Sequence, residues 1–180
     1  RLALAQDLAR RHSFTVDRDG FYALIVTARC RSGKQLGEWG GEDVRIEIDG
    51  AKFREIPPHD KPQYYDIPPA WNGTELNGLS KTVTVITRLN KGAHTLVFIP
   101  RGSATVEHEP VIERIEDVRR VVFDLDVQAE EGDRRPWYTF ALIDVPLKSI
   151  TAEVTAQWRW RDSDDVKLVV DNAIKKHMNV

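Results

Sequence analysis

One alternating stretch constrains the fold of this chain more than any other. Residues 43–50 alternate apolar and polar side chains and end in Asp-Gly. In an extended strand, Val44, Ile46 and Ile48 share one face. The terminal Asp-Gly is typical of a tight turn, in which glycine tolerates a left-handed backbone. The stretch therefore predicts a half-buried β-strand that leads into a hairpin turn.

A similar stretch near the carboxyl end indicates an internal repeat. Residues 165–172 also alternate and end in asparagine, which tolerates a left-handed backbone. Upstream, Thr27-Ala28 aligns with Thr155-Ala156, which matches the strand expected at residues 21–29 to residues 149–157. Similarity at so long a spacing indicates duplicated domains and not a short-period repeat. We therefore expect one module at residues 1–117 and a partial, possibly duplicated unit at residues 118–180 that packs on the first.

Short strands separated by turn residues recur along the whole chain. Besides the two stretches above, the pattern predicts strands at residues 14–16, 21–29, 82–89, 94–99, 111–115, 121–127, 137–143 and 149–160. Turns are expected at residues 17–20, 90–92 and 162–165, with Gly20 at a positive φ. Such regular spacing is typical of an all-β sandwich. Cys30 falls in the inward register of its strand, so we expect a buried thiol.

Composition and charge exclude several classes of protein. The formal net charge is −2 with both signs interspersed, which gives no electrostatic footprint for nucleic acid. The single cysteine excludes an intrachain disulfide and a cysteine-based zinc site. No apolar run is long enough to span a bilayer. Because the chain begins at Arg1 without a signal peptide, we expect a fragment or a processed product.

Two long loops carry the residues best suited to binding. Residues 31–42 hold four glycines and Trp39, and residues 54–81 hold five prolines with Tyr64, Tyr65 and Trp71. We expect the second to be an ordered, proline-stiffened surface loop. Flat aromatic faces and planar polar side chains suit sugar recognition. Trp39, between two glycines, is expected to face solvent, whereas Trp71 is as readily a plug that anchors its loop.

The order of motifs resembles a known family. Val16 to Arg29 reads Val-x-x-x-Gly-Phe-Tyr-x-Leu-x-Val-x-Ala-Arg, a later strand ends in Ile48-Asp-Gly50, and Leu89 to His94 reads Leu-Asn-Lys-Gly-Ala-His. This resembles the galactose-binding-like jelly rolls, most of all the carbohydrate-binding modules of families six and thirty-five. The resemblance implies a jelly-roll β-sandwich at residues 1–117, followed by a partial second β-sandwich unit.

The same resemblance implies a function. We expect a non-catalytic carbohydrate-binding module of a larger extracellular or cell-surface protein, with a polysaccharide or glycan and the other domains of the parent polypeptide as partners. The expected ligand-binding residues are Arg31, Trp39, Asp60, Tyr64, Tyr65, Trp71, Asn72 and Glu75. A structural calcium between Asp7 and Asp117 is also implied. In this chain the family's sugar-binding asparagine and opening glutamate are replaced, because residues 107–110 hold no asparagine and residue 6 is glutamine.

Other functions stay open at this point. No Gly-x-Ser-x-Gly, His-Glu-x-x-His or phosphate-binding glycine-rich motif occurs, so we do not expect an enzyme. The alternative function is a structural or adhesive module that binds protein in a surface assembly, with self-assembly through the second unit. Asn72-Gly73-Thr74 fits the acceptor pattern for N-glycosylation. Trp158 and Trp160 are expected in the core, and residues 162–165 as a solvated turn.

Overall fold

The computed structural model describes residues 2–3, 8–52, 70–124, 138–155, 158–160, 162–163, 165–170 and 173–179. The described residues form two compact units, one that ends at Val145 and one that begins at Pro146. The first unit contains two packed sheets and two short helices, and the second contains two hairpins. The chain is therefore an all-β protein, as the alternating patterns predict.

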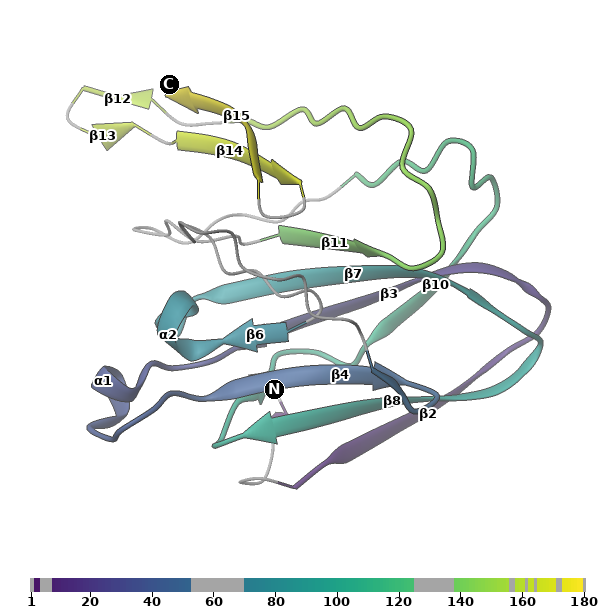
Figure 1. The fold of residues 1–180 in the computed structure, drawn as a ribbon, viewed down its shortest axis with the longest axis horizontal. Coiled ribbons are helices and arrows are strands. Elements are labelled where there is room, and N and C mark those ends of the chain that lie inside the picture. Colours follow the sequence, from purple (N-terminus) through teal and green to yellow (C-terminus); the bar gives the residue numbers. More distant parts are fainter. Residues whose placement is uncertain are drawn as a thin grey trace. The chain divides into compact units, whose positions relative to one another are not determined.

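The first sheet of the first unit has β3 and β7 at its centre (Figure 1). Its strands are, in order, β1 (Leu2–Ala3), β9 (Thr105–Val106), β3 (Gly20–Arg29), β7 (Ser80–Leu89) and β11 (Tyr138–Leu142), and β10 (Val111–Ile115) pairs with the other half of β3. All its pairs are antiparallel except β7 with β11, which is parallel. β11 lies beyond residue 117, where the sequence places the module boundary, yet it belongs to this sheet.

The second sheet packs on the first and completes the sandwich. Its strands are, in order, β2 (Arg10–Val16), β8 (Gly92–Arg101), β4 (Asp43–Ile48) and β5 (Ala51–Lys52), and β6 (Ala70–Asn72) pairs with the start of β4. All these pairs are antiparallel. Helices α1 (Gly33–Leu36) and α2 (Gly73–Leu76) lie at one end of the sandwich (Figure 1).

The core lies between the two sheets and is formed by the residues that the alternation predicts. The predicted inward residues are all buried: Tyr22, Leu24, Val26, Val44, Ile46 and Ile48. Cys30 is also fully buried, and burial raises the pKa of its thiol far above the ordinary range, so it is a small apolar residue of the core. The turn after β4 is as predicted, because Asp49 and Gly50 both have positive φ (51° and 77°).

Several local predictions are wrong. Gly20 opens β3 without a positive φ, since that strand begins at the glycine itself. The loop predicted at residues 31–42 contains α1, and the end of the loop predicted at residues 54–81 contains β6 and α2, because local caps stabilise a single helical turn in each. Residues 54–69 lie outside the described residues, so the order of the proline-rich loop stays a prediction. The region expected to begin the second unit has no strand over residues 121–124. Leu125 and Val127 lie outside the described residues.

The second unit consists of two hairpins. β12 (Trp158–Arg159) pairs with β13 (Asp162–Ser163), and β14 (Asp165–Val170) pairs with β15 (Ala173–Asn179). The strand predicted at residues 149–160 is wrong over residues 149–155, where Ile150 and Val154 are exposed and no strand forms. Residues 162–165 lie largely in strands and not in the predicted turn, and Trp160 is exposed and not in a core.

A histidine connects the two turns at the other end of the first unit. The Nδ1 of His94 lies 2.7 Å from Asp49 Oδ2, and its Nε2 lies 2.7 Å from the carbonyl oxygen of Asn90. Both partners are acceptors, so only the protonated ring, which donates from both nitrogens, satisfies both contacts. Partial burial alone would lower the pKa of His94, but the hydrogen bonds to Asp49 and Asn90 raise it above the ordinary value.

This contact predicts a loss of stability at alkaline pH. The pKa of His94 is raised in the folded state, so its protonated ring stabilises the fold. This stabilisation is fully present below the pKa of the unfolded chain, about 6.5, and is lost as pH rises through the folded pKa. We expect a loss of about 1 kcal/mol in the free energy of unfolding, measured by urea denaturation between pH 5.5 and 9. His94→Gln should remove this slope, whereas His108→Gln, which changes an exposed histidine, should keep it. An unchanged slope in His94→Gln would contradict the assignment.

Candidate ligand-binding site

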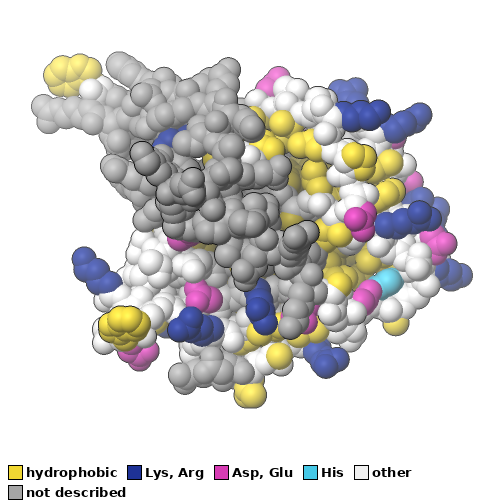
Figure 2. Space-filling view, viewed as in Figure 1, with side chains coloured by type: hydrophobic (Ala, Val, Ile, Leu, Met, Phe, Trp, Pro, Cys, Tyr) yellow, Lys and Arg dark blue, Asp and Glu magenta, His cyan; other side chains and the backbone are white. Residues whose placement is uncertain are grey.

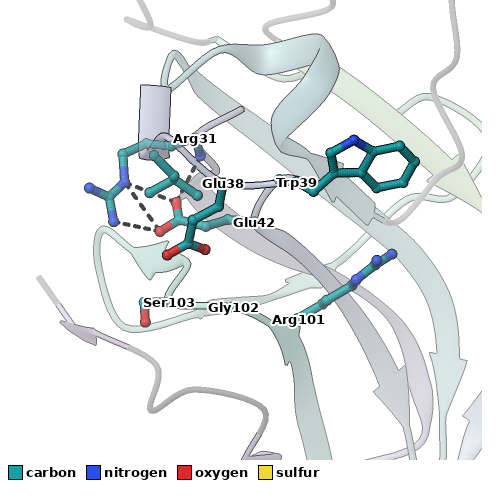
Figure 3. Close-up of a pocket in the computed structure, with 10 residues that line it drawn as sticks. Arg31, Glu38, Trp39, Glu42, Arg101, Gly102 and Ser103 are labelled. Carbon is teal, nitrogen blue, oxygen red and sulfur yellow. Dashed lines mark hydrogen bonds and ion pairs between the residues drawn. The ribbon is translucent and has the colours of Figure 1, made fainter. Parts of the chain in front are cut away.

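An open hollow of about 310 Å³ lies in the first unit, between the loop that carries α1 and the turn that joins β8 to β9 (Figure 3). We call it the Trp39 hollow. Its lining is mostly polar, and the residues are Arg31, Leu36, Glu38, Trp39, Gly40, Gly41, Glu42, Arg101, Gly102 and Ser103. The volume is at the lower end of the range for small-molecule sites, roughly 300–1,000 Å³.

Local hydrogen bonds fold the loop that forms one wall. Ser32 precedes α1, and its backbone N–H donates to the side chain of Gln35 (3.0 Å) while the Gln35 N–H donates to the Ser32 carbonyl (3.0 Å). Gly37 ends the helix at a φ of 69°, a left-handed conformation that glycine adopts at low cost. The Gln35 side chain also donates to the Asn77 carbonyl (2.7 Å), which ties this loop to the end of α2.

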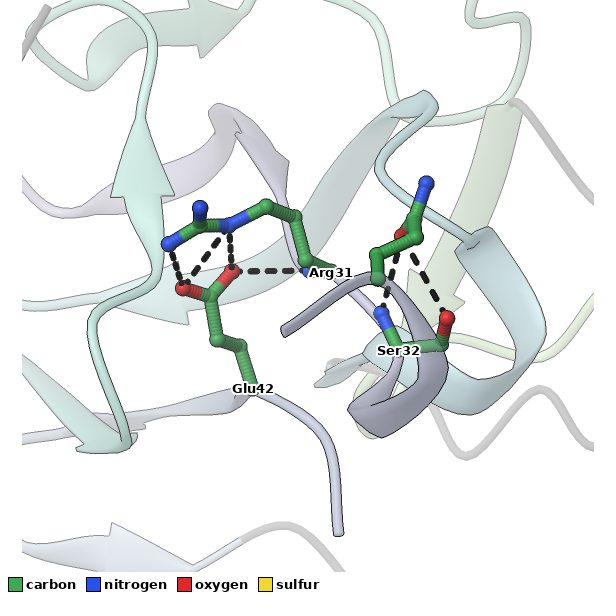
Figure 4. A network of polar contacts seen from close by, with 4 residues as sticks. Arg31, Ser32 and Glu42 are labelled. Carbon is green, nitrogen blue, oxygen red and sulfur yellow. Dashed lines mark hydrogen bonds and ion pairs between the residues drawn. The ribbon is translucent and has the colours of Figure 1, made fainter. Parts of the chain in front are cut away.

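An ion pair between the exposed Arg31 and the buried Glu42 closes the base of the same loop. Arg31 Nη2 lies 2.6 Å from Glu42 Oε1, and the Arg31 backbone N–H donates to Glu42 Oε2 (2.8 Å), as Figure 4 shows. The Glu42 N–H in turn donates to the Arg31 carbonyl (2.8 Å). The Glu42 carboxylate is buried, and its hydrogen bonds to Arg31 raise the pKa of the guanidinium. These bonds hold the two ends of the loop together with both charges compensated.

Glycines allow the backbones around the hollow to approach closely. A Cβ on Gly73 would lie 2.2 Å from the Arg31 carbonyl oxygen and 2.5 Å from that of Glu42, so only glycine fits. Gly102 has a φ of 79°, and a Cβ there would lie 3.3 Å from the Cγ of Glu42. The base of the hollow is therefore formed by packed backbone and is present without a ligand.

Trp39 and Arg101 form the exposed part of the hollow. The Trp39 side chain is fully exposed, and the Arg101 side chain is 76% exposed. In Figure 3 both extend in the same direction, away from the Arg31–Glu42 pair. Among the described residues, the ion-pair partner of Arg101 is Asp43, whose Oδ2 lies 3.9 Å from Nη1. Burial raises the pKa of Asp43. An indole face and a guanidinium are thus both open to a ligand.

Of the predicted ligand-binding residues that the structure describes, two lie in the lining of the hollow and three lie outside it. Arg31 and Trp39 both line the hollow. Trp71 as a ligand platform is wrong, because its side chain is fully buried in the core. Asn72 and Glu75 lie at the start of α2 and outside the lining of the hollow. Asp60, Tyr64 and Tyr65 fall outside the described residues.

Sequence reasoning missed the four lining residues with charged or hydroxyl side chains other than Arg31: Glu38, Glu42, Arg101 and Ser103. Glu38 and Glu42 flank the predicted Trp39 in sequence, so the signal for them was their proximity to an aromatic residue in a glycine-rich loop. Arg101 and Ser103 come from a turn some sixty residues later, and no local pattern connects them to Trp39. Only the pairing of β4 with β8 brings the two segments together.

The predicted calcium site involves one described residue. Asp117 is exposed, and its carboxylate accepts hydrogen bonds from the guanidinium of Arg119 at 2.9 and 3.1 Å. These bonds lower the pKa of Asp117. Asp7 lies outside the described residues. Among the parts of the chain that are described, no three histidine, cysteine, aspartate or glutamate side chains gather as metal ligands.

Comparison with family models, with curated proteins and with solved structures finds no match to the chain. The described helices are each a single turn, and none has the length and apolar character to cross a membrane. On the face drawn in Figure 2, basic and acidic side chains are interspersed among the described residues.

Proposed function

We propose that the chain is a non-catalytic carbohydrate-binding module with a galactose-binding-like jelly-roll fold, part of a larger extracellular or cell-surface protein. The observation that carries the proposal is the fully exposed Trp39 beside a polar hollow whose base is built from packed backbone. A large aromatic side chain left in solvent forfeits the free energy of burial, so a ligand that covers it gains that free energy.

The chemistry of the lining matches that of a sugar. A pyranose ring has an apolar C–H face, which stacks on an indole, and a rim of hydroxyl groups. Arg101 supplies only donors, Glu38 supplies only acceptors, and Ser103 supplies both, so vicinal hydroxyls find partners of each kind. Two arginines and two glutamates line the hollow, and their formal charges cancel. This balance favours a neutral ligand.

The carboxylates of the hollow support binding and not hydrolysis. Glycoside hydrolysis uses a pair of carboxyl groups, one as acid and one as base or nucleophile. Glu42 is buried, and both its oxygens accept hydrogen bonds from Arg31. Among the described residues that line the hollow, this leaves Glu38 as the single accessible carboxylate. A single carboxylate serves recognition, which is why the proposal is a non-catalytic module.

A glycan-array screen with matched variants tests the proposal. We expect wild-type protein to bind at least one glycan, and Trp39→Ala to weaken binding by about 2 kcal/mol, roughly thirtyfold. Trp160→Ala is the matched control, because Trp160 is also exposed but lies in the second unit. It should bind as wild type does. An array without a positive glycan, or equal losses in both variants, would overturn the proposal.

One observation favours the alternative, an adhesive or structural module that binds protein. Val111, Ile25, Thr84 and Phe140 are cross-strand neighbours in successive strands of the first sheet, so they form one row on its outer face. Val111 and Phe140 at the ends of the row are 47% and 36% exposed, whereas Thr84 between them is buried, so the exposed apolar surface lies at the two ends of the row. In this alternative the array is blank, and analytical ultracentrifugation detects self-association or a protein complex.

A further inference from the structure

The sequence holds one acceptor motif for a covalent modification that the proposed function does not use. Of the five asparagines in the chain, only Asn72 is followed by any residue and then threonine or serine. The motif is Asn72-Gly73-Thr74, at the junction of β6 and α2. This is the recognised pattern for transfer of an N-linked glycan, which occupies protein surfaces.

The fold leaves this motif at the surface. Asn72 and Thr74 are exposed, whereas Trp71 before them and Gly73 between them are buried. The backbone at Gly73 is held by a hydrogen bond from its N–H to the Glu42 carbonyl (2.8 Å). The backbone is therefore anchored, and the side chains that carry the motif point away from the core.

The oxygen and the nitrogen of the Asn72 side-chain amide have different roles. Asn72 precedes α2, and its Oδ1 accepts hydrogen bonds from the N–H groups of Thr74 (2.9 Å) and Glu75 (3.3 Å). This is a helix N-cap, which stabilises the first turn of α2. The Nδ2 atom takes no part in the cap, so a substituent on Nδ2 leaves the cap intact.

We propose that Asn72 is an N-glycosylation site. In the reaction, Nδ2 of Asn72 loses one proton and forms a bond to the anomeric carbon of an oligosaccharide. The bond from that carbon to a lipid-linked pyrophosphate breaks, and the lipid pyrophosphate leaves with the electron pair. The co-substrate is thus a lipid-linked oligosaccharide pyrophosphate, which the secretory compartment supplies. The inference does not depend on ligand binding in the Trp39 hollow.

The test is expression of the complete chain behind a secretory leader in cultured animal cells. Total cell membranes and medium are both treated with peptide-N-glycosidase, so the result does not depend on secretion. We expect one glycosidase-sensitive mass increment in the wild-type chain. Thr74→Ser should keep the increment and Thr74→Ala should lose it.

The Thr74→Ala variant separates modification from folding. The cap uses the backbone N–H of Thr74, which alanine retains, so the glycan should disappear without loss of the cap. Asn77→Gln, which changes a nearby exposed asparagine outside the motif, should leave the increment unchanged. A wild-type chain without a glycosidase-sensitive increment overturns the inference, as does an increment that persists in Thr74→Ala.

Discussion

Trp71→Ala is expected to lower the free energy of unfolding by about 3–5 kcal/mol, the range for truncating a large buried aromatic side chain. Trp71 is fully buried, and its Nε1–H donates to the carbonyl of Lys81 (2.8 Å). It is also the cross-strand neighbour of Val44 in the predicted central strand. The change therefore creates a cavity and removes the indole donor from a buried carbonyl.

Urea denaturation at constant pH measures this effect. Trp39→Ala and Trp160→Ala remove the same indole group from exposed positions, so both should remain close to wild type. If Trp71→Ala cost less than about 1 kcal/mol, the side chain would not be a core residue. Trp71 would then return as a candidate for ligand binding.

The second large effect concerns the ion pair between Arg29 and Glu107. Glu107 is buried, and it accepts hydrogen bonds from Arg29 Nε and from Ser80 Oγ (2.8 Å). Burial alone would raise the pKa of Glu107, but the hydrogen bonds from Arg29 and Ser80 lower it. Arg29→Met is expected to cost about 3 kcal/mol at neutral pH, because a buried carboxylate loses its cation.

The pH dependence of the free energy of unfolding shows whether the loss comes from the ion pair. The folded pKa of Glu107 is lowered, so its contribution is present above the unfolded value of about 4.5 and is lost as pH falls through the folded pKa. The difference in the free energy of unfolding between Arg29→Met and wild type should therefore become smaller below pH 4.5. Arg119→Met, in an exposed pair with Asp117, should change little at any pH. If this difference stayed constant down to pH 3, the lower stability of Arg29→Met would come from lost packing and not from the ion pair.

The strands of the sandwich could be predicted from the sequence where apolar and polar residues alternate. Buried and more exposed positions alternate along much of β3, β4 and β8, and alternation is a local property of the sequence, whereas β7 is buried continuously over residues 81–86. The prediction fails at residues 149–155, where the same alternation occurs in a segment without a strand. A pattern of alternation specifies a face but not a partner strand, and a strand without a partner does not form. For this reason the parallel pairing of β11 with β7 was also not predicted.

The candidate site could be predicted only where a single residue is conspicuous in its own loop. Trp39 stands between glycines, so its exposure followed from local geometry. Trp71 stands in an equally loop-like sequence but is buried, because β6 pairs with β4. The contribution of Arg101 depends on a contact between distant strands, and no local rule supplies that contact.

The proposed function requires that a glycan contacts Trp39, and one measurement tests this contact directly. The protein is labelled with nitrogen-15, and the indole N–H signals of its five tryptophans are followed by NMR during titration with the best glycan from the array. The signal that disappears in Trp39→Ala should shift progressively to saturation. The signal of Trp71, whose N–H is held by the Lys81 carbonyl, should stay in place. A bound glycan that leaves the Trp39 signal unmoved, or the failure of every glycan to shift it, would contradict the account.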